Sequence, residues 1–220
     1  MQEVRLQFSK EGRAVYISHL DVMRCFSRAM GRAGLPVHYT QGFNPQPYLV
    51  FSPPLSLGYA GQAEFCDFSL EDDALPLEQV AGLLAATMPE GLCPKSSAAP
   101  VHKLGLLHKA TYTIALELGG GSVATAEEVE ACLTRSEITV IKKSKRRQIE
   151  TNIAPLIEQL SVETRGNGIM LFCRLAVVGE GALNPRYLVE VLQRDLPQLD
   201  IADSLVTRQA FFLEDDAPFC

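Results

Sequence analysis

Residues 16–58, YISHLDVMRCFSRAMGRAGLPVHYTQGFNPQPYLVFSPPLSLG, decide the fold of the first half of the chain. Ser18 has the side chain of a helix N-cap, and Asp21 follows it at the spacing that lets both side chains bond free amides of a first helical turn. Gly34 suits the left-handed position after a helix, and Pro36 prevents the helix from continuing. The stretch therefore predicts a helix between these two signals.

The predicted helix has an apolar face and a basic face. The apolar residues at helical spacing are Leu20, Met23, Phe26, Met30 and Ala33. Arg24, Arg28 and Arg32 follow one another at intervals of four residues, so they form one ridge, here called the arginine ridge. Such a ridge is either a solvated helix face or a surface that binds an anion, and the sequence leaves both interpretations open.

A long loop, residues 41–61, follows a strand predicted over residues 35–40. It contains Pro45, Pro47, Pro53 and Pro54, which make the loop stiff and extended. The same loop carries Phe43, Asn44 and Tyr48, which we expect to be binding residues. Apolar side chains in a long loop must pack on the sheet, on a partner or on stacked bases, so the loop is either a contact surface or a cover for an open sheet face.

The order of predicted elements is β-α-β-β-α-β over residues 1–100 and again over residues 108–220. This order is that of the ferredoxin-like split motif. We therefore predict an α+β fold with two ferredoxin-like halves and antiparallel sheets. The second half contains an additional hairpin, residues 137–152, between its middle strands. No residue-level repeat relates the two halves.

The hairpin carries the densest group of charges in the chain. Five of the twenty basic residues lie within six positions of it: Lys142, Lys143, Lys145, Arg146 and Arg147. At a hairpin tip these side chains are free to reach phosphates. They can equally be a solvated tip that prevents aggregation of sheet edges, so we retain both interpretations.

Composition limits the classes of function. The net charge of −6 argues against general affinity for nucleic acids, although it permits a local basic patch. The sequence has no apolar run long enough to span a bilayer and no secretory signal, so we expect a cytoplasmic protein without a membrane partner. The six cysteines are far apart and form no CxxC pair, which predicts no metal site and no iron–sulfur or other cofactor.

His19 is the one candidate for a catalytic residue. It lies in the first turn of the predicted helix, where the helix dipole lowers the pKa of an imidazole and keeps it neutral. A neutral imidazole near the arginine ridge can act as general base on a ribose 2′-hydroxyl. A histidine at a helix N-terminus is more often a capping or packing residue, which is the alternative.

The stretch over residues 18–58, followed by EFCDF at residues 64–68, resembles the radical-SAM-linked, or radical-SAM-associated, family of uncharacterised bacterial proteins. In that family a domain of this kind stands alone or is fused behind a cobalamin-binding-type radical-SAM enzyme. The resemblance extends through the Lys-rich hairpin to NPRYLVEVL at residues 184–192. NPRY departs from the Arg-Pro pattern of the family at this helix start, which puts a role for Arg186 in doubt.

The resemblance implies a partner, a radical-SAM enzyme, and does not imply a reaction. The first hypothesis is a non-catalytic accessory module that presents RNA or another anionic substrate to that enzyme. The second is an RNA-processing or RNA-modifying enzyme that uses His19 as general base and the arginines to stabilise charge. The third is a scaffold that binds protein through the loop.

Overall fold

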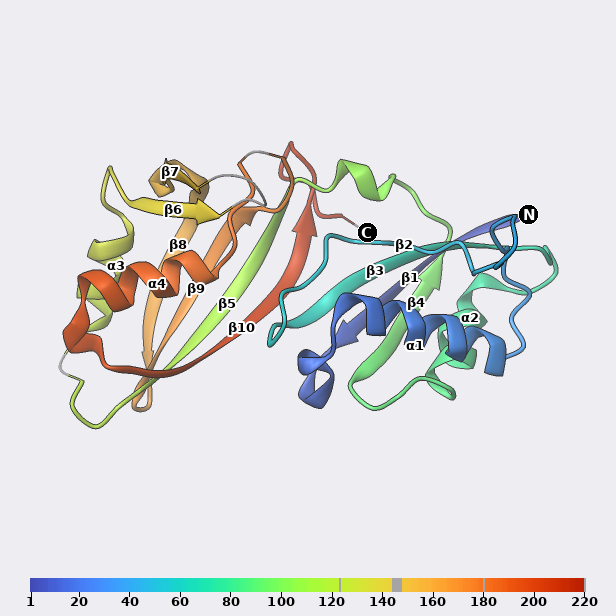
Figure 1. Cartoon of the computed structure of the whole chain (residues 1–220), viewed down its shortest axis with the longest axis horizontal. Helices are drawn as coiled ribbons and strands as arrows, with labels where there is room; N and C mark the ends of the chain where they lie inside the picture. The colour runs from blue at the N-terminus through green and yellow to red at the C-terminus, as the bar shows by residue number, and fades with distance from the viewer. Residues whose placement is uncertain (123, 144–147, 180, 220) are drawn as a thin grey trace. The chain divides into compact units, whose positions relative to one another are not determined.

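The structure is a computed structural model that describes residues 1–122, 124–143, 148–179 and 181–219 (Figure 1). The described part is a mixed α+β fold with mostly antiparallel sheet and four α-helices. The chain divides into two compact units. Unit 1 contains Met1–Leu107 and Ala210–Cys220, and unit 2 contains His108–Gln209. None of the described helices is long and apolar enough to cross a membrane.

Unit 1 is built on three long strands. Its elements are β1 (Gln2–Lys10), α1 (His19–Arg32), β2 (Val50–Phe51), β3 (Ala60–Leu70), α2 (Leu77–Ala85) and β4 (Leu92–Ala98). β1 pairs antiparallel with β3 on one side and with β4 on the other, and the short strand β2 pairs antiparallel with Cys66 and Asp67 of β3. Two short 3-10 helices, Gly12–Tyr16 and Leu104–Leu106, lie before α1 and after β4.

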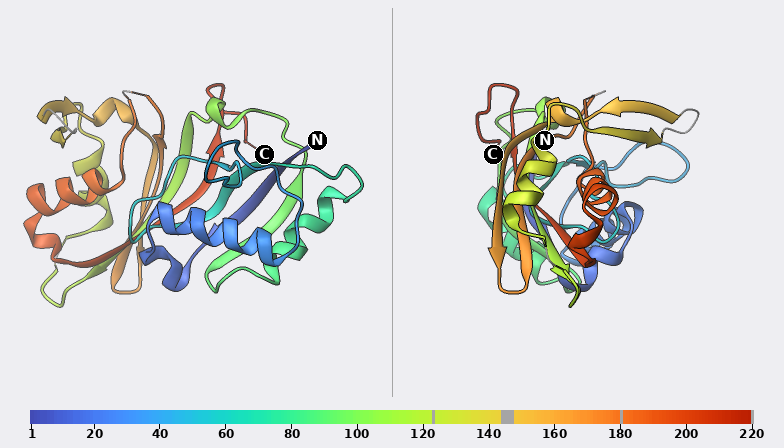
Figure 2. Two further views of the ribbon diagram at one scale, coloured as in Figure 1. Left: turned by 45° about the vertical axis from the view of Figure 1, so that its right-hand side comes forward. Right: turned by 90° about the vertical axis from the view of Figure 1, so that its left-hand side faces the viewer.

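One face of the unit 1 sheet is covered by α1 and α2 (Figure 1, Figure 2). Alternate residues of β1 point to this face and pack in one core with Phe26 of α1 and Leu84 of α2. These β1 residues are Val4, Leu6 and Phe8. The opposite face carries Arg5, whose guanidinium lies 4.5 Å from the ring centroid of Phe219 in the C-terminal segment. Both faces of the sheet are therefore covered, one by helices and the other partly by the end of the chain.

Helix α1 has the caps that the sequence predicts. The Ser18 hydroxyl accepts a hydrogen bond from the Asp21 amide, and Gly34 has a φ of +65°. The predicted apolar stripe is partly wrong, because Leu20 is 63% exposed and the residues buried on α1 include Val22 and Ala29. The helix is turned so that these two smaller side chains lie against the core.

Residues 35–40 do not form the predicted strand. They make only isolated bridges, one between Val37 and Leu70 and one between Tyr39 and Pro47. Pro36 supplies no amide hydrogen, so a continuous ladder cannot begin at this point. Residues 14–16 lie within the 3-10 helix Gly12–Tyr16.

Unit 2 has the sheet order β10-β5-β9-β8. Its elements are β5 (Lys109–Leu118), α3 (Ala126–Leu133), β6 (Thr139–Lys143), β7 (Gln148–Asn152), β8 (Ile157–Arg165), β9 (Gly168–Ala176), α4 (Arg186–Asp195) and β10 (Ile201–Phe212), whose last residues belong to unit 1. β6 and β7 form a separate two-stranded antiparallel sheet between α3 and β8. Thr125 and Glu128 form a capping box at the start of α3.

Candidate functional site

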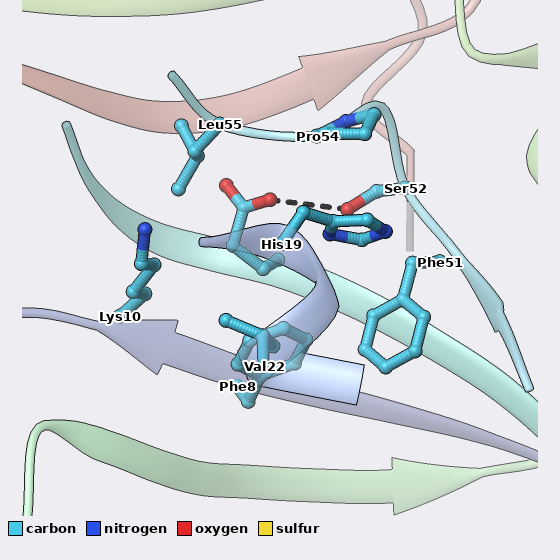
Figure 3. Close-up of a pocket in the computed structure, with 9 residues that line it drawn as sticks. Phe8, Lys10, His19, Val22, Phe51, Ser52, Pro54 and Leu55 are labelled. Atoms are coloured by element: carbon cyan, nitrogen blue, oxygen red, sulfur yellow. Dashed lines mark hydrogen bonds between the residues drawn. The ribbon is translucent and has the colours of Figure 1, made fainter. Parts of the chain in front are cut away.

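A small pocket lies in unit 1 where the first turn of α1 meets residues 49–61, the inner part of the long loop (Figure 3). Its polar lining consists of Lys10, His19, Ser52 and Glu64. Its apolar lining consists of Phe8, Val22, Phe51, Pro54 and Leu55. Figure 3 shows Lys10 and His19 approaching the pocket from different elements, with Pro54 and Leu55 on the side of the loop. Segments far apart in the sequence therefore bring four polar side chains together.

Lys10 and Glu64 reach the pocket because each occupies a strand position whose side chain points toward the apolar core. Lys10 continues the alternation of the β1 core residues, and Glu64 continues that of Cys66 and Phe68 on β3. Both are nearly inaccessible, with 3% of Lys10 and 4% of Glu64 exposed. Buried charges of this kind are costly unless they are paired or functional.

A β-bulge positions the carboxylate of Glu64. Phe8 is opposite Glu64, but two residues further along β1, Lys10 is opposite Gly61, so β3 contains one extra residue. A Cβ atom on Gly61 would lie 2.4 Å from Oε1 of Glu64. Because glycine has no Cβ, the Glu64 side chain can occupy this space.

Ser52 attaches the inner part of the loop to this bulge. Its hydroxyl donates to Glu64 Oε2 at 3.1 Å and accepts from the Phe65 amide at 3.2 Å. Lys10 attaches the segment before α1 in a similar way, because its Nζ donates to the carbonyls of Val15 at 3.4 Å and Ile17 at 3.2 Å. The polar residues thus hold both walls of the pocket.

The imidazole of His19 is held by packing against the inner part of the loop. Its ring meets Phe51 edge-on at a centroid distance of 5.3 Å. Neither ring nitrogen makes a hydrogen bond to any residue that the structure describes. Burial, followed by the charge of Lys10, lowers the pKa of His19, while Glu64 acts in the opposite direction. The sequence predicted a lowered pKa from the helix dipole, but burial is the larger cause.

The cavity beside His19 is the size of a single small group. The volume that the centre of a water molecule can occupy in this cavity is about 20 Å³, which is enough for about one water. A neutral imidazole beside such a cavity can accept a proton from one water or one substrate hydroxyl. Among the described residues, no group of three or more His, Cys, Asp or Glu side chains is suited to hold a metal ion.

The arginine ridge lies on the other side of α1 from His19. At 100° per residue, Arg24 and Arg28 are turned roughly 140° and 180° from His19. Both arginines are exposed, and Nη1 of Arg24 bonds Oδ1 of Asp21 at 3.1 Å. Arg32 donates to the carbonyl of Thr87 at 2.6 Å. The ridge therefore cannot stabilise charge at His19, and Lys10 is the cation of that pocket.

The binding residues predicted on the loop lie on residues 41–48, its outer part. Phe43 is as exposed as in an isolated peptide, at 113%, and Tyr48 is 56% exposed. Asn44 is also exposed, and its side-chain oxygen accepts from Gln46 Nε2 at 3.3 Å. The ends of this outer part are tied together, because the Thr40 amide donates to the Gln46 carbonyl at 2.8 Å and the Gln46 amide donates to Thr40 Oγ1 at 3.1 Å.

The basic hairpin belongs to unit 2, whereas the other candidate residues belong to unit 1. Nζ of Lys142 donates to the carbonyl of Ala182 at 2.9 Å, so this ammonium is engaged within the unit. Lys143 ends β6, and its side chain lies outside the described part of the chain. Lys145, Arg146 and Arg147 lie outside the described residues altogether.

Sequence reasoning missed Lys10, Ser52 and Glu64. A signal for two of them was present, because a lysine and a glutamate occupy the inward phase of otherwise apolar strands. Ser52 gave no such signal, since a serine before two prolines in a loop is unremarkable without knowledge of the bulge beneath it.

Comparisons with known proteins identify a family and a fold. Residues 3–185 match the family DUF2344, described as "Uncharacterized protein conserved in bacteria". A comparison with curated proteins finds no match.

Solved structures of low sequence identity are similar to this chain. A chain in the crystal structure of a Cbf5-Nop10-Gar1 complex is similar, with a TM-score of 0.51 and 12% identity over 96% of this chain and 50% of that one. A chain of the archaeal box H/ACA sRNP Nop10-Cbf5 complex has a TM-score of 0.48 and 11% identity, over 93% of this chain and 46% of that one. The chain spans about half the length of these solved chains, and at such identities the likeness concerns the fold alone.

Proposed function

The chain belongs to the DUF2344 family of proteins conserved in bacteria, and we propose that it is a non-catalytic accessory module that binds RNA and presents it to a radical-SAM enzyme in the cytoplasm. The observation that carries the proposal is the outer part of the loop, where Phe43 is fully exposed on a segment whose ends are tied by hydrogen bonds. An exposed aromatic ring on a segment closed by hydrogen bonds is a ready surface for a stacked base.

The local charges of unit 1 support an anionic ligand in spite of the overall charge of −6. Arg28 is exposed and makes no ion pair or hydrogen bond within the described residues. Arg24 and Arg32 each make one exposed contact, which a phosphate can replace at little cost. The basic cluster of unit 2 is the second proposed source of phosphate contacts.

The radical-SAM partner rests on the resemblance in sequence over residues 18–68 and 184–192. Affinity capture of the full chain from native cells is the direct test. Recovery of a radical-SAM protein supports the partnership, and its repeated absence under mild salt removes this part of the proposal.

RNA binding is tested with fluorescently labelled single-stranded RNA and the Phe43→Ala variant. Loss of one stacked base is worth about 1–3 kcal/mol, so the affinity should fall about fivefold or more. Tyr16→Ala is the matched control, because Tyr16 is an aromatic residue of the same unit, 74% exposed and outside the loop. Wild-type protein that retains no RNA at low salt would overturn the proposal, as would equal affinities of the Phe43→Ala and wild-type proteins.

A second candidate function, RNA cleavage, is favoured by the pocket of His19. In this reaction His19 takes the proton of a ribose 2′-hydroxyl while the oxygen of that hydroxyl forms a bond to the adjacent phosphorus. The bond from phosphorus to the 5′-oxygen breaks, water protonates the leaving oxygen, and the hydroxide that remains takes the proton from His19. The products are a 2′,3′-cyclic phosphate and a 5′-hydroxyl end. The free ring nitrogens of His19 and the nearby charge of Lys10 support this candidate.

The test is incubation of wild-type, His19→Gln and Lys95→Ala proteins with total cellular RNA; Lys95 is an exposed residue of the same unit outside the pocket. We expect cyclic-phosphate ends with wild type and Lys95→Ala, and none with His19→Gln. Equal patterns with wild type and His19→Gln would exclude His19 as the base.

We also propose that each unit is a ferredoxin-like half. Support comes from the pairing order, which is β4-β1-β3-β2 in unit 1 and β10-β5-β9-β8 in unit 2. When these four strands are counted along the chain, each unit has one helix between its first and second strands and another between its third and fourth strands. An experimental structure of the protein tests this.

A further inference from the structure

A groove of about 440 Å³ lies on the face of the unit 1 sheet opposite α1. Val50 of β2 is opposite Asp67 of β3, and Glu3 of β1 is opposite Ser69 of β3, so these residues share one face. The neighbouring residue Phe51 points to the other face and packs with the helix. The groove has the volume of a site for a small organic group.

One wall of the groove is fixed by a buried arginine. Arg5, only 4% exposed, donates from Nε and Nη2 to the two carboxylate oxygens of Asp67 at 2.9 and 2.7 Å. The same Nη2 donates to the carbonyl of His102 at 2.5 Å. The segment of residues 100–105 is thereby held on the sheet, and the carboxylate of Asp67 is neutralised. The groove is therefore formed before any ligand binds.

The remaining lining offers exposed side chains of different chemistry: an aromatic ring, an aliphatic group, an ammonium and a carboxylate. The ring of Tyr48 is 56% exposed at one wall, and Val101 is 72% exposed at the other. Lys103 and Glu3 are both exposed, and neither makes an ion pair or hydrogen bond with a residue that the structure describes. The groove therefore combines an aromatic face, one cation and one hydrogen-bond acceptor.

We propose that this groove binds one nucleotide unit of single-stranded RNA. The base stacks on Tyr48 and contacts Val101, Lys103 pairs with a phosphate, and the carboxylate of Glu3 accepts a hydrogen bond from the ribose 2′-hydroxyl. Stacking on an aromatic ring, one phosphate contact and recognition of the 2′-hydroxyl are the elements of single-stranded RNA recognition. The inference rests on the proposed RNA binding and adds a subsite separate from the exposed ring of Phe43.

The test compares the affinities of full-length variants for a labelled single-stranded RNA and for DNA of the same sequence over a range of salt. Tyr48→Ala should weaken binding to both about fivefold or more. Lys103→Ala should reduce the slope of log affinity against log salt by about one. Glu3→Gln should reduce the preference for RNA over DNA.

The matched controls are Tyr16→Ala and Lys95→Ala, exposed residues of the same unit that do not line the groove; both should bind like wild type. Thermal unfolding monitored by circular dichroism checks that each variant is folded. Cross-linking of an RNA that contains 5-iodouridine, followed by mass spectrometry, should place a nucleotide on Tyr48.

The outcomes separate the groove from the broader proposal. If Phe43→Ala weakens RNA binding while the Tyr48 and Lys103 variants bind normally, the groove inference is wrong and the proposed function stands. If wild type binds no RNA, both are wrong. The inference is also overturned if the residues of the groove become protected from solvent only when a protein partner, and not RNA, is added.

Discussion

The outer and inner parts of the loop over residues 41–61 each contain one phenylalanine, and the two rings have opposite surroundings. In the inner part, Phe51 meets Phe26 edge-on at a centroid distance of 5.2 Å and lies 6.2 Å from Phe8. In the outer part, Phe43 is fully exposed. The difference comes from strand pairing, because Val50 and Phe51 pair with β3 and direct Phe51 to the helix-covered face. Backbone pairing therefore decides which of the two phenylalanine rings packs against the core.

The largest expected effect is the contrast between the two phenylalanines in stability. Phe51→Ala removes a ring from the core and should lower the free energy of unfolding by about 2–4 kcal/mol. Phe43→Ala should change it by less than about 0.5 kcal/mol, since it removes an exposed side chain. Urea denaturation measures both, and equal losses would contradict the division of the loop into a packed part and a presented part.

The second prediction concerns the glycine below the inner part. Gly61→Ala places a Cβ against the buried, hydrogen-bonded side chain of Glu64 and should cost about 1–3 kcal/mol. Gly31→Ala is the control, because Gly31 lies in α1 with nothing within 4 Å of a Cβ and the change should stabilise by up to about 1 kcal/mol. A neutral Gly61→Ala variant would show that the bulge tolerates a side chain and that Glu64 is free to move.

A third, smaller effect is the pH dependence of stability that His19 contributes. Its pKa is lowered in the folded protein from an ordinary value of 6.5, so the unfolded chain binds the proton more readily. The contribution of His19 is therefore fully present above about pH 6.5 and is lost as the pH falls through the folded pKa. His19→Gln should make the loss of stability between pH 7 and pH 5 less steep.

Nuclear magnetic resonance titration of the His19 ring provides the matched test. Lys10→Met should raise the pKa of His19 and Glu64→Gln should lower it further, because the two charges act in opposite directions. Shifts of the same sign in both variants would show that the pocket is arranged differently.

The smallest expected effect is on the outer part. Thr40→Val removes the hydroxyl that accepts from the Gln46 amide at 3.1 Å. Because this bond is exposed, the loss of stability should be about 0.5 kcal/mol. RNA affinity should fall more clearly than stability, since the segment that carries Phe43 loses one of the two hydrogen bonds that close it. Unchanged affinity would mean that the prolines alone keep the loop in shape.

Local signals in the sequence located both ends of α1. Ser18 marks its start and Gly34 its end, because capping depends on side chains within one turn. The capping box of Thr125 and Glu128 at the start of α3 is a signal of the same local kind. The rotation of α1 was not predictable in this way, because apolar residues occur on more than half of its surface. The sheet decides which of them are buried.

The pocket of His19 depends on contacts between distant residues. Glu64 and Ser52 are twelve residues apart, and Lys10 comes from another strand. Their meeting requires the register of β1 against β3, including the extra residue of the bulge. Propensity and spacing carry no information on that register. The exposed state of Phe43 and Tyr48 could be expected from the stiff loop, whereas the inward turn of Phe51 could not.

Phe219 is part of the covering of Arg5 in unit 1 and is itself only 6% exposed, and its amide donates to the carbonyl of Phe211 at 2.9 Å. The ribosome makes these residues after all of unit 2. The first unit to emerge therefore lacks part of its own interior until unit 2 has been made. During synthesis, Arg5 and Phe65 remain open to solvent or to a chaperone while more than a hundred later residues are added.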